Sequence, residues 1–339
     1  MKIKIAELEN IITKILLTEY TSEEANLIKD VLMFGELSGK PSHGLLRLLK
    51  GNFGVFVDDK RGTPEYNRKT KVSTIIDAKG NPGMLAAPLA VEEAINLGKE
   101  NGIGIVGVKN FVNTTGSVSY YVEKIAKQNL IGIAFVQAVN NLVAPFGTKK
   151  PFFGTNPIAF GVPAEPKPFI FDMSTAAIAY GNVMNAKINN KNLPENVAID
   201  KDGNPTTDPA EVIDGAILPV GNSYKGSGLA MMVELLGSVW VGGGFAGLHM
   251  ENGSGNLYLA MSPDLLSDVE SFKKRVQELV ETLKSAETRD GSPVRIPGEN
   301  TFAKRDKSLE SGEIDITDAT FQKIQENYSS IVSSHEGKI

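Results

Sequence analysis

The chain has 339 residues, of which 41% are hydrophobic and 22% are charged, an ordinary globular composition with enough length for two or three sub-domains. The net charge of -5 and the isoelectric point near 5.5 argue against a protein that binds nucleic acid or an anionic membrane surface. The complete absence of cysteine excludes disulfides, thiolate metal sites and cysteine nucleophiles.

The N-terminal part predicts one helix followed by an exposed segment. Thr21-Ser22-Glu23-Glu24 has the pattern of a capping box, and apolar residues then recur at helical spacing up to Gly35. A short turn leads to Ser42-His43-Gly44, and the charged residues 57–71 predict an exposed loop or edge. The first nine residues mix acids with short apolar runs and are not a signal peptide.

From residue 73 onward, helical patterns alternate with short apolar runs. Strands are predicted at 72–76, 103–108, 131–136, 157–162 and 169–171, and helices at 84–99 and 118–128. This alternation predicts an α/β sheet with flanking helices.

The last third predicts three helices and one strand. Residues 226–241 are apolar nearly all round, which predicts a buried helix ended by Gly242-Gly243-Gly244. A strand is expected at 257–261, and Ser262-Pro263 is a good helix start before the apolar face that runs from Val269 to Leu283. A final helix is expected near 318–331, with Phe321, Ile324, Tyr328 and Ile331 on one face.

No run of eighteen apolar residues occurs, so we expect no membrane span. The three histidines, at positions 43, 249 and 335, are too scattered for a His-rich metal site. We therefore expect a cytoplasmic protein with no metal ion and with neither nucleic acid nor membrane as a partner.

Ser42-His43-Gly44-Leu45-Leu46-Arg47 is the stretch that points most clearly to chemistry. Imidazole is the usual proton shuttle near neutral pH, and guanidinium is the usual bidentate clamp for a carboxylate. If 43–47 is helical, His43 and Arg47 share a face and one substrate can meet both. The alternative is an ordinary helix start with Ser42 as N-cap and the other two side chains in solvent.

Two glycine-rich stretches are candidates for a cofactor phosphate. Gly102-Ile103-Gly104-Ile105-Val106-Gly107 matches G-x-G-x-x-G, but it is itself the apolar strand and does not open a helix, so we discount it. Lys225-Gly226-Ser227-Gly228 opens the helix at 226–241, where free N–H groups and the helix dipole favour an anion. A glycine-rich turn into a packed helix explains the same residues.

Short polar residues at strand ends form two further candidates. Gly154-Thr155-Asn156-Pro157 precedes one apolar strand, and Asp172-Met173-Ser174 follows another. Such strand ends are where α/β proteins place ligands, and Asp172 is suited to a ribose hydroxyl. Either stretch alone is equally well explained as a turn.

Together these stretches resemble the malate/L-lactate dehydrogenase family that includes ureidoglycolate dehydrogenase, sulfolactate dehydrogenase, diketogulonate reductase and a cyclic-imine carboxylate reductase, and that is unrelated to the Rossmann-type enzymes. The resemblance runs from about residue 20 to residue 300. The motifs that carry it are Ser42-His43-Gly44 with Arg47, Gly154-Thr155-Asn156-Pro157-Ile158-Ala159, Asp172-Met173-Ser174, Leu218-Pro219 through Lys225-Gly226-Ser227-Gly228-Leu229-Ala230, and Ile296-Pro297-Gly298-Glu299.

The resemblance implies a non-Rossmann NAD(P)-binding α/β fold like that of sulfolactate dehydrogenase, with a mixed sheet and a helical N-terminal region. It implies a homodimer that uses NAD or NADP and acts on a small carboxylate substrate. His43 and Arg47, with Ser42 beside them, would be catalytic, and residues 169–175, Lys225-Gly226 and Pro297-Gly298-Glu299 would contact the cofactor. We divide the chain into an N-terminal helical and substrate region (1–72), a cofactor-binding α/β domain (73–250) and a C-terminal segment (251–339) that packs back on the first.

The chain departs from the family pattern at two places. Thr114 stands where many members carry a second catalytic histidine, shortly before Tyr120-Tyr121, and Glu195-Asn196 stands where members often show Gly-Trp. Threonine cannot act as a base near neutral pH. Three functions therefore stay open: hydride transfer to and from a 2-hydroxy or 2-oxo acid, reduction of a cyclic-imine carboxylate, and a cofactor-binding paralogue without turnover.

Overall fold

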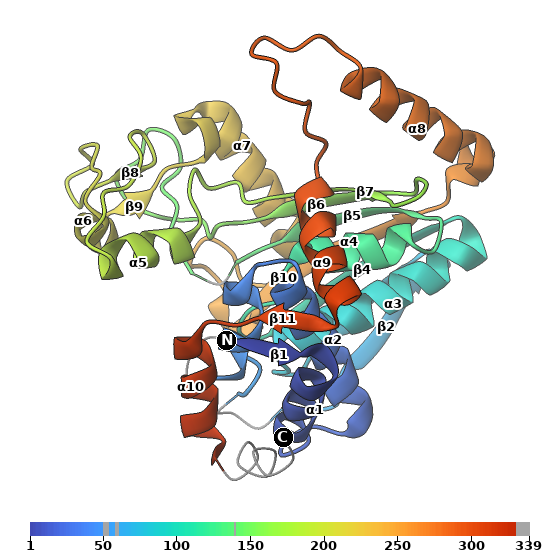
Figure 1. Cartoon of the computed structure of the whole chain (residues 1–339), viewed down its shortest axis with the longest axis horizontal. Helices are drawn as coiled ribbons and strands as arrows, with labels where there is room; N and C mark the ends of the chain where they lie inside the picture. The colour runs from blue at the N-terminus through green and yellow to red at the C-terminus, as the bar shows by residue number, and fades with distance from the viewer. Residues whose placement is uncertain (50–53, 58–60, 139, 330–339) are drawn as a thin grey trace.

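The computed structural model describes residues 1–49, 54–57, 61–138 and 140–329, and a seven-stranded mixed sheet forms its centre (Figure 1). The strand order is β2-β3-β4-β10-β5-β6-β7; β3 and β4 are parallel and every other neighbouring pair is antiparallel. The strands are β2 (Glu65–Thr70), β3 (Ser73–Asp77), β4 (Ile103–Phe111), β5 (Ile131–Val136), β6 (Ile158–Val162), β7 (Phe169–Met173) and β10 (Ser254–Met261). The predicted mixed α/β fold is confirmed.

Helices surround this sheet, and two small sheets lie outside it. The helices are α1 (Ile5–Leu16), α2 (Ser22–Leu37), α3 (Gly83–Asn101), α4 (Val118–Ala126), α5 (Tyr180–Ile188), α6 (Pro209–Asp214), α7 (Tyr224–Val233), which a π-helical turn over Glu234–Val239 continues, α8 (Val269–Lys284), α9 (Glu299–Ser311) and α10 (Asp318–Asn327). The small sheets pair β1 (Lys2–Lys4) with β11 (Glu313–Asp315) and β8 (Ala198–Ile199) with β9 (Ala216–Ile217). Short 3-10 turns are η1 (Pro41–His43), η2 (Leu45–Leu48), η3 (Val220–Asn222), η5 (Met250–Asn252) and η6 (Pro263–Leu265).

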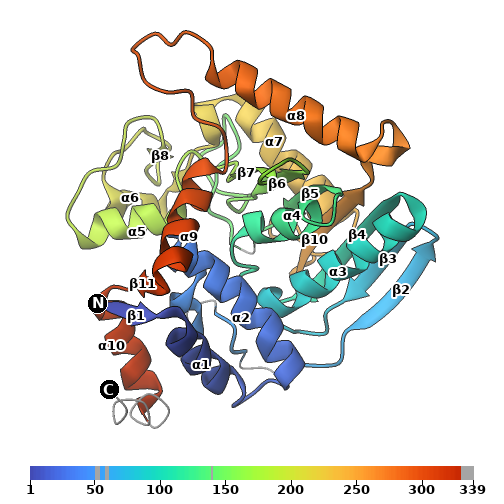
Figure 2. The same cartoon turned by 45° about the vertical axis from the view of Figure 1, so that its right-hand side comes forward.

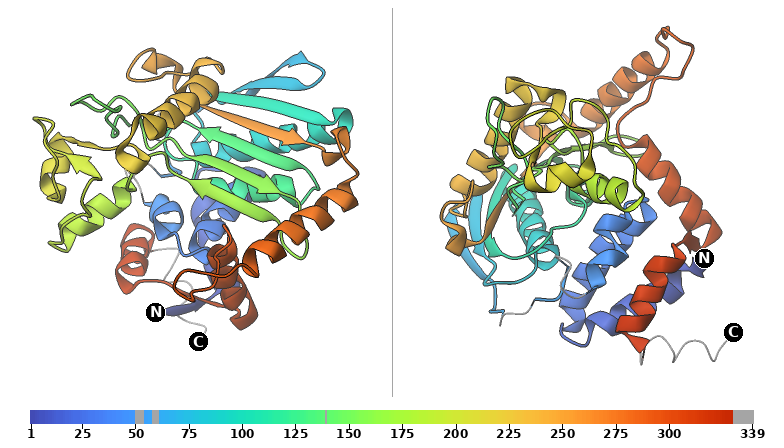
Figure 3. Two further views of the ribbon diagram at one scale, coloured as in Figure 1. Left: turned by 90° about the horizontal axis from the view of Figure 1, so that it is seen from above. Right: turned by 90° about the vertical axis from the view of Figure 1, so that its left-hand side faces the viewer.

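The two faces of the sheet are covered by different helices. Gly104 on β4 faces α3, where a Cβ atom would collide with the Ala94 carbonyl, whereas Gly107 faces the Val241 side chain beyond α7. Successive strand residues alternate between faces, so α3 lies on one side and the end of the α7 segment on the other. Figure 3 shows α7 in front of the sheet in the view from above. The discounted G-x-G-x-x-G stretch is not a phosphate loop: Gly102 ends α3 in a left-handed conformation, and Gly104 and Gly107 lie on β4.

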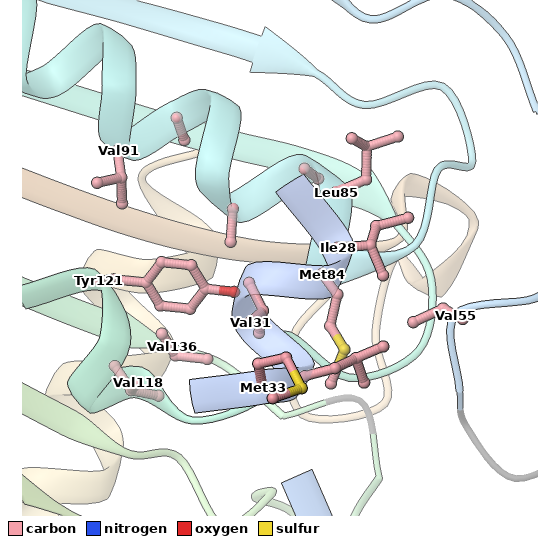
Figure 4. Close-up of a cluster of buried hydrophobic side chains, with 14 of the residues drawn as sticks. Ile28, Val31, Met33, Val55, Met84, Leu85, Val91, Val118, Tyr121 and Val136 are labelled. Carbon is pink, nitrogen blue, oxygen red and sulfur yellow. The ribbon is translucent and has the colours of Figure 1, made fainter. Parts of the chain in front are cut away.

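The main core joins the N-terminal helices to the sheet. Figure 4 shows Ile28 and Val31 of α2 against Met84 of α3 and Tyr121 of α4, and all four side chains are buried. The predicted capping box at Thr21 is present and begins α2. The core thereby fixes the end of α2, from which the Ser42-His43 segment follows directly.

The C-terminal segment returns to the N-terminal region (Figure 2). Strand β11 pairs with β1, and the Tyr328 hydroxyl donates a 2.6 Å hydrogen bond to the Leu48 carbonyl. Strand β10, which follows residue 250, lies between β4 and β5, and β2 from the N-terminal 72 residues forms the edge of the same sheet. The division of the chain at residues 72 and 250 stays a prediction.

The structure corrects the expectation of a helix over 43–47. Two 3-10 turns, η1 and η2, meet at Gly44, whose φ of -117° and ψ of -128° end the first turn. A Cβ atom on Gly44 would lie 2.5 Å from Oε1 of Glu36, so only glycine fits beside this buried carboxyl. His43 and Arg47 consequently do not lie on one α-helical face.

The helix expected at 226–241 forms, but the prediction that it is buried is wrong. It runs as α7 and a π-helical turn, and Met231, Leu235 and Trp240 are 48%, 43% and 61% exposed. Only one side of the helix meets the sheet, and the apolar residues on the other side are about half exposed to solvent. The apolar pattern therefore includes a side of the helix that the described part of this chain leaves partly exposed.

Two smaller expectations also change. Ser262-Pro263 begins the short turn η6, and α8 starts later with Asp268 as its N-cap, because the Asp268 side chain accepts a hydrogen bond from the Ser271 amide. The last helix ends at Asn327, and Ile331 lies outside the described residues. The charged segment before β3 contains the fully exposed edge strand β2, in agreement with the expected loop or edge.

Candidate active site

The predicted Ser42-His43-Arg47 group forms a compact, partly buried cluster at the turn after α2. The Ser42 hydroxyl lies 3.0 Å from Nδ1 of His43, and Nε of Arg47 donates a 2.6 Å hydrogen bond to the Ser42 carbonyl. All three residues are intermediate in exposure, so the alternative of a fully solvated helix start does not hold. Although no α-helix joins them, the two short turns still keep the imidazole and the guanidinium together.

The surroundings of His43 favour its neutral form. Burial lowers the pKa of the His43 imidazole to about 4, and the positive charges of Arg47 and Lys40 act in the same direction. The carboxylate of Asp172 opposes them by raising this pKa. His43 is therefore an uncharged base at neutral pH, in electrostatic contact with a group on β7 that lies 129 residues further along the chain.

Lys40 links this cluster to the strand end at Asp172. Its Nζ atom lies 3.1 Å from Oδ2 of Asp172 and forms hydrogen bonds of 3.2 Å and 3.1 Å to the hydroxyls of Ser117 and Ser119. Ser119 also donates to the same carboxylate oxygen, from its hydroxyl at 2.5 Å and from its amide at 3.2 Å. Sequence reasoning missed Lys40, Ser117 and Ser119, because no local pattern shows that residues 40 and 172 meet.

A cavity of about 250 Å³ opens beside this ion pair. Asp172 and Lys40 form one wall, and Pro297, Gly298 and Thr301 form another at the start of α9. The structure thus brings together two stretches that were predicted separately as cofactor contacts. Gly298 has φ 91° and its backbone lies against Ile170, where a Cβ atom would sit 3.0 Å from the Ile170 carbonyl.

A buried ion pair holds α9 against this cavity. Arg305 donates hydrogen bonds of 2.8 Å and 2.7 Å to the two carboxylate oxygens of Glu123, and the side chains are 13% and 4% exposed. The guanidinium also lies over the rings of Phe34 and Phe302, 5.2 Å and 5.1 Å from their centroids. Because Arg305 lies two turns after Gly298 on the same helix, this pair sets the position of the Pro297-Gly298 wall.

The Thr155-Asn156 stretch lies next to the end of β7. Ser174 donates its hydroxyl to the Thr155 carbonyl at 2.8 Å, and the Thr175 amide donates to the same carbonyl at 3.0 Å. Asn156 is fully buried, and its amide donates to Glu234 on the π-helical turn at 2.8 Å. Asn156 therefore ties the strand ends to the α7 segment, while Thr155 and Ser174 are partly exposed beside it.

The Lys225-Gly226 stretch begins α7, as expected, and it lies near the same strand end. The Val220 amide donates to the Thr175 carbonyl at 2.8 Å, which places the segment before α7 beside β7. Ser223 is the N-cap and accepts from the Gly226 amide at 3.4 Å. Lys225 is exposed, whereas Gly226 is buried. Only glycine fits at position 226, because a Cβ atom there would collide with the Val220 carbonyl.

The remaining predicted residues lie around this site. Thr114 is partly exposed, and its hydroxyl accepts from the Gly116 amide at 3.1 Å in the loop that also presents Ser117. Met173 is partly exposed on β7. Glu299 forms an ion pair with Lys284, which lowers the pKa of its carboxyl, and it accepts a hydrogen bond from the Ile296 amide.

The described residues contain neither a metal-binding cluster nor a membrane-spanning helix. Within the ranges given above, no three His, Cys, Asp or Glu side chains gather as a metal site would require. In the same ranges no helix has the length and apolar character needed to cross a membrane.

Comparison with known proteins identifies the family of this chain. The sequence model described as malate/L-lactate dehydrogenase matches residues 3–325, which is nearly the whole chain. The chain belongs to the malate/L-lactate dehydrogenase family. It is therefore a dehydrogenase or reductase, and the resemblance inferred from its motifs is confirmed.

Three members of the family illustrate the range of relatives. The chain is 33% identical to L-sulfolactate dehydrogenase of Methanocaldococcus jannaschii over 303 residues, which cover 86% of this chain and 87% of the relative. A solved structure of sulfolactate dehydrogenase from that organism has a TM-score of 0.86 at 30% identity and covers 98% of both chains. Ureidoglycolate dehydrogenase (NAD(+)) of Escherichia coli is 31% identical and covers 88% of each chain. Delta(1)-pyrroline-2-carboxylate/Delta(1)-piperideine-2-carboxylate reductase of Pseudomonas putida is 31% identical and covers 96% of each chain.

Proposed function

We propose that this protein is an NAD(P)-dependent oxidoreductase that interconverts a small 2-hydroxy acid and its 2-oxo acid. The observation that carries the proposal is the meeting of His43 and Arg47 with Asp172 through Lys40, next to a cavity that Pro297 and Gly298 complete. A proton-transfer group, a carboxylate-binding group and a recess that can take part of a cofactor then lie at one site. The relatives named for sulfolactate and ureidoglycolate act on molecules of this class.

The residues at the cavity fit a nicotinamide cofactor. All the hydrogen bonds of the Asp172 carboxylate within the described part of the chain end on Oδ2, so Oδ1 is available to accept from a ribose hydroxyl. Gly298 lets the start of α9 pack closely against Ile170 at the cavity, and the start of α7 at Lys225-Gly226 would face phosphate groups. When bound, the cofactor supplies or accepts the hydride.

The roles of the chain's own groups at the substrate follow from their charge. Arg47 would bind the substrate carboxylate through its planar guanidinium, which matches a carboxylate in geometry. His43 is neutral at neutral pH and would accept the hydroxyl proton as a 2-hydroxy acid is oxidised, returning it in the reverse direction. Arg47 cannot share this proton task, since guanidinium does not lose its proton in proteins.

A second candidate is reduction of a cyclic-imine carboxylate. The relative named as a pyrroline and piperideine carboxylate reductase matches 96% of this chain, more than the sulfolactate and ureidoglycolate relatives do. Such a substrate brings the same carboxylate to Arg47 but a C=N bond in place of C=O. Thr114, in place of a second histidine, is compatible with this different proton requirement.

We also propose that the protein is a homodimer. The outer side of α7 and its π-helical turn exposes Met231, Leu235 and Trp240. Helix α8 stands off from the sheet and is joined to α9 by a long connection (Figure 1). Its apolar residues Leu279 and Leu283 are 59% and 45% exposed. Apolar faces of this size on soluble proteins usually mark an interface.

The experiment for the proposed function is oxidation of NADH and of NADPH against a panel of 2-oxo acids and cyclic imines that carry a carboxylate. Turnover of a 2-oxo acid supports the first candidate, and turnover of imines alone supports the second. Matched neutral analogues, such as the methyl ester of the best substrate, should react much more slowly because they lose the contact with Arg47. Equal rates for acid and ester would contradict the assigned site.

A further inference from the structure

We propose that Lys40 is a positioning residue of this site, whose ammonium group fixes the Asp172 carboxylate at the cavity and places a positive charge near His43. This inference rests on the proposed function and adds to it a residue that no motif indicated. It follows from where Lys40 lies, three residues before His43 and directly before the turn η1.

The contacts of Lys40 are those of a fixed group. An ammonium group has three N–H donors, and the three acceptors around Nζ are Asp172, Ser117 and Ser119, all within 3.2 Å. These acceptors come from β7 and from the start of α4, so Lys40 joins three separate parts of the chain. The acceptors are themselves mostly buried, since Ser117 and Ser119 are each 3% exposed and the Asp172 side chain is 14% exposed.

The charges around His43 explain why this position matters. Arg47 and Lys40 bring two positive charges to the imidazole, and Asp172 brings one negative charge. Glu36 reaches the same turn from α2, but burial raises the pKa of its carboxyl and so favours its neutral form. Without Lys40, the Asp172 carboxylate would act on His43 unopposed by its present partner and would favour the protonated imidazole.

A protonated His43 could not accept a proton from the substrate hydroxyl. Loss of the Lys40 charge would therefore move the acid side of the pH profile toward neutral pH. Loss of Lys40 would also release Asp172 from the segment before η1, whereas the hydrogen bonds from Ser119 on α4 would remain. The shift of the pH profile is an electrostatic effect, and it distinguishes the proposed role of Lys40 from a purely structural one.

The test is the titration of the His43 ring signals by NMR, which needs neither substrate nor cofactor. The chain has only three histidines, so the signals are few, and His43→Gln assigns them by subtraction. In the parent protein we expect no protonation of His43 between about pH 7 and about pH 5. In Lys40→Met we expect the midpoint to rise by about half a pH unit or more.

Two further variants control this measurement. Lys40→Arg retains the charge and should keep the parent titration. Lys304→Met removes a lysine whose side chain lies against Gly39, on the same turn, but which forms no ion pair with Asp172 within the described residues, and it too should titrate like the parent. If the midpoint of Lys40→Met equals that of the parent, or if Lys304→Met shifts it as much, the proposal is overturned.

A cofactor measurement separates this proposal from the function on which it rests. The melting temperature of the parent should rise with NAD(H) or NADP(H) whatever the titration of His43 shows. Lack of that rise contradicts the proposed oxidoreductase function alone. An unshifted His43 titration contradicts the role of Lys40 alone. Once a substrate is known, Lys40→Met should lower kcat/KM most strongly at low pH, and Lys40→Arg should restore it.

Discussion

Replacement of Arg305 by leucine should destabilise the protein strongly, because it breaks the buried ion pair that holds α9 on α4. The Glu123 side chain is 4% exposed, and it would lose both of its hydrogen bonds from the guanidinium. Lys127 would remain 2.7 Å from Glu123, but that lysine is 58% exposed and is mostly screened by water. The carboxylate would then be a buried charge with weak compensation.

The size of the effect follows from two contributions. Removal of one partner of a buried ion pair costs about 3–5 kcal/mol in free energy of unfolding, and Lys127 places this case near the lower end. Loss of the cation–π contacts with Phe34 and Phe302 adds roughly 0.5–1 kcal/mol for each ring. The sum is about 4–5 kcal/mol, which for a chain of 339 residues lowers the melting temperature by about 6 °C.

The assay is urea unfolding followed by circular dichroism, with calorimetry for the melting temperature. The matched control is Lys167→Met, which breaks the ion pair of Lys167 with Asp306 on the same helix; its side chains are 42% and 38% exposed. That variant should lose no more than about 1 kcal/mol. If Arg305→Leu lowers the free energy of unfolding no more than Lys167→Met does, the Arg305–Glu123 ion pair does not hold α9 in place. The role assigned to that pair at the cavity wall would then be wrong.

Four further outcomes are expected. His43→Ala should lower kcat by roughly 10²–10⁴-fold without unfolding the protein. An unchanged rate and pH profile would mean that another group transfers the proton. Arg47→Lys should raise KM strongly and leave cofactor binding intact, because lysine keeps the charge but lacks the planar guanidinium. A variant with the same kinetics as the parent would show that Arg47 does not bind the substrate carboxylate. Since burial lowers the pKa of His43 from 6.5 to about 4, the unfolded chain binds a proton there before the folded one, so stability should fall as pH drops from about 6.5 to about 4; His43→Gln should flatten this slope, and an equal slope in both proteins would contradict it. Trp240→Asp should convert the proposed dimer to a monomer in light scattering, while exposed Lys225→Asp at the start of the same helix should not; a dimeric Trp240→Asp protein would exclude the α7 face as the interface.

The sheet could be predicted from the sequence because its information is local. Apolar runs such as 131–136 coincide with β5, and the capping box at Thr21 begins α2 as expected. The order of the strands could not be predicted in this way. Strand β10 comes late in the chain yet lies between β4 and β5, and no local pattern specifies that partner choice.

Several residues of the site could be predicted from the sequence, but their arrangement in space could not. His43, Asp172 and Gly298 were each found from residue type and position. The structure places Asp172 and Gly298 at one recess, and His43 within the electrostatic influence of the Lys40–Asp172 ion pair. Lys40 was missed because its partner lies 132 residues away. A lysine in a turn has no sequence signature that separates a solvated charge from one that, like Lys40, is partly buried and hydrogen-bonded to three side chains.

Two predictions failed for physical reasons that the sequence does not display. The helix considered over 43–47 does not form, because the φ of -117° and ψ of -128° at Gly44 are not helical; the buried Glu36 carboxyl beside Gly44 leaves no room for a side chain there. The α7 segment has the composition of a buried helix, yet Met231 and Trp240 are exposed in the single chain. The spacing of apolar residues indicates which side of a helix avoids water, but it does not show whether the same chain buries that side.

The central claim is that the recess between Asp172 and Gly298 binds a nicotinamide cofactor. The most direct measurement is the melting temperature with NAD(+), NADH, NADP(+) and NADPH, for the parent and for Asp172→Ala. A ligand at about one hundred times its dissociation constant stabilises the folded protein by about 2.7 kcal/mol, so at least one of the four should raise the melting temperature of the parent by several degrees. The rise should be much smaller in Asp172→Ala. No shift of the parent with any of the four nucleotides, or the same shift in Asp172→Ala, would contradict the account.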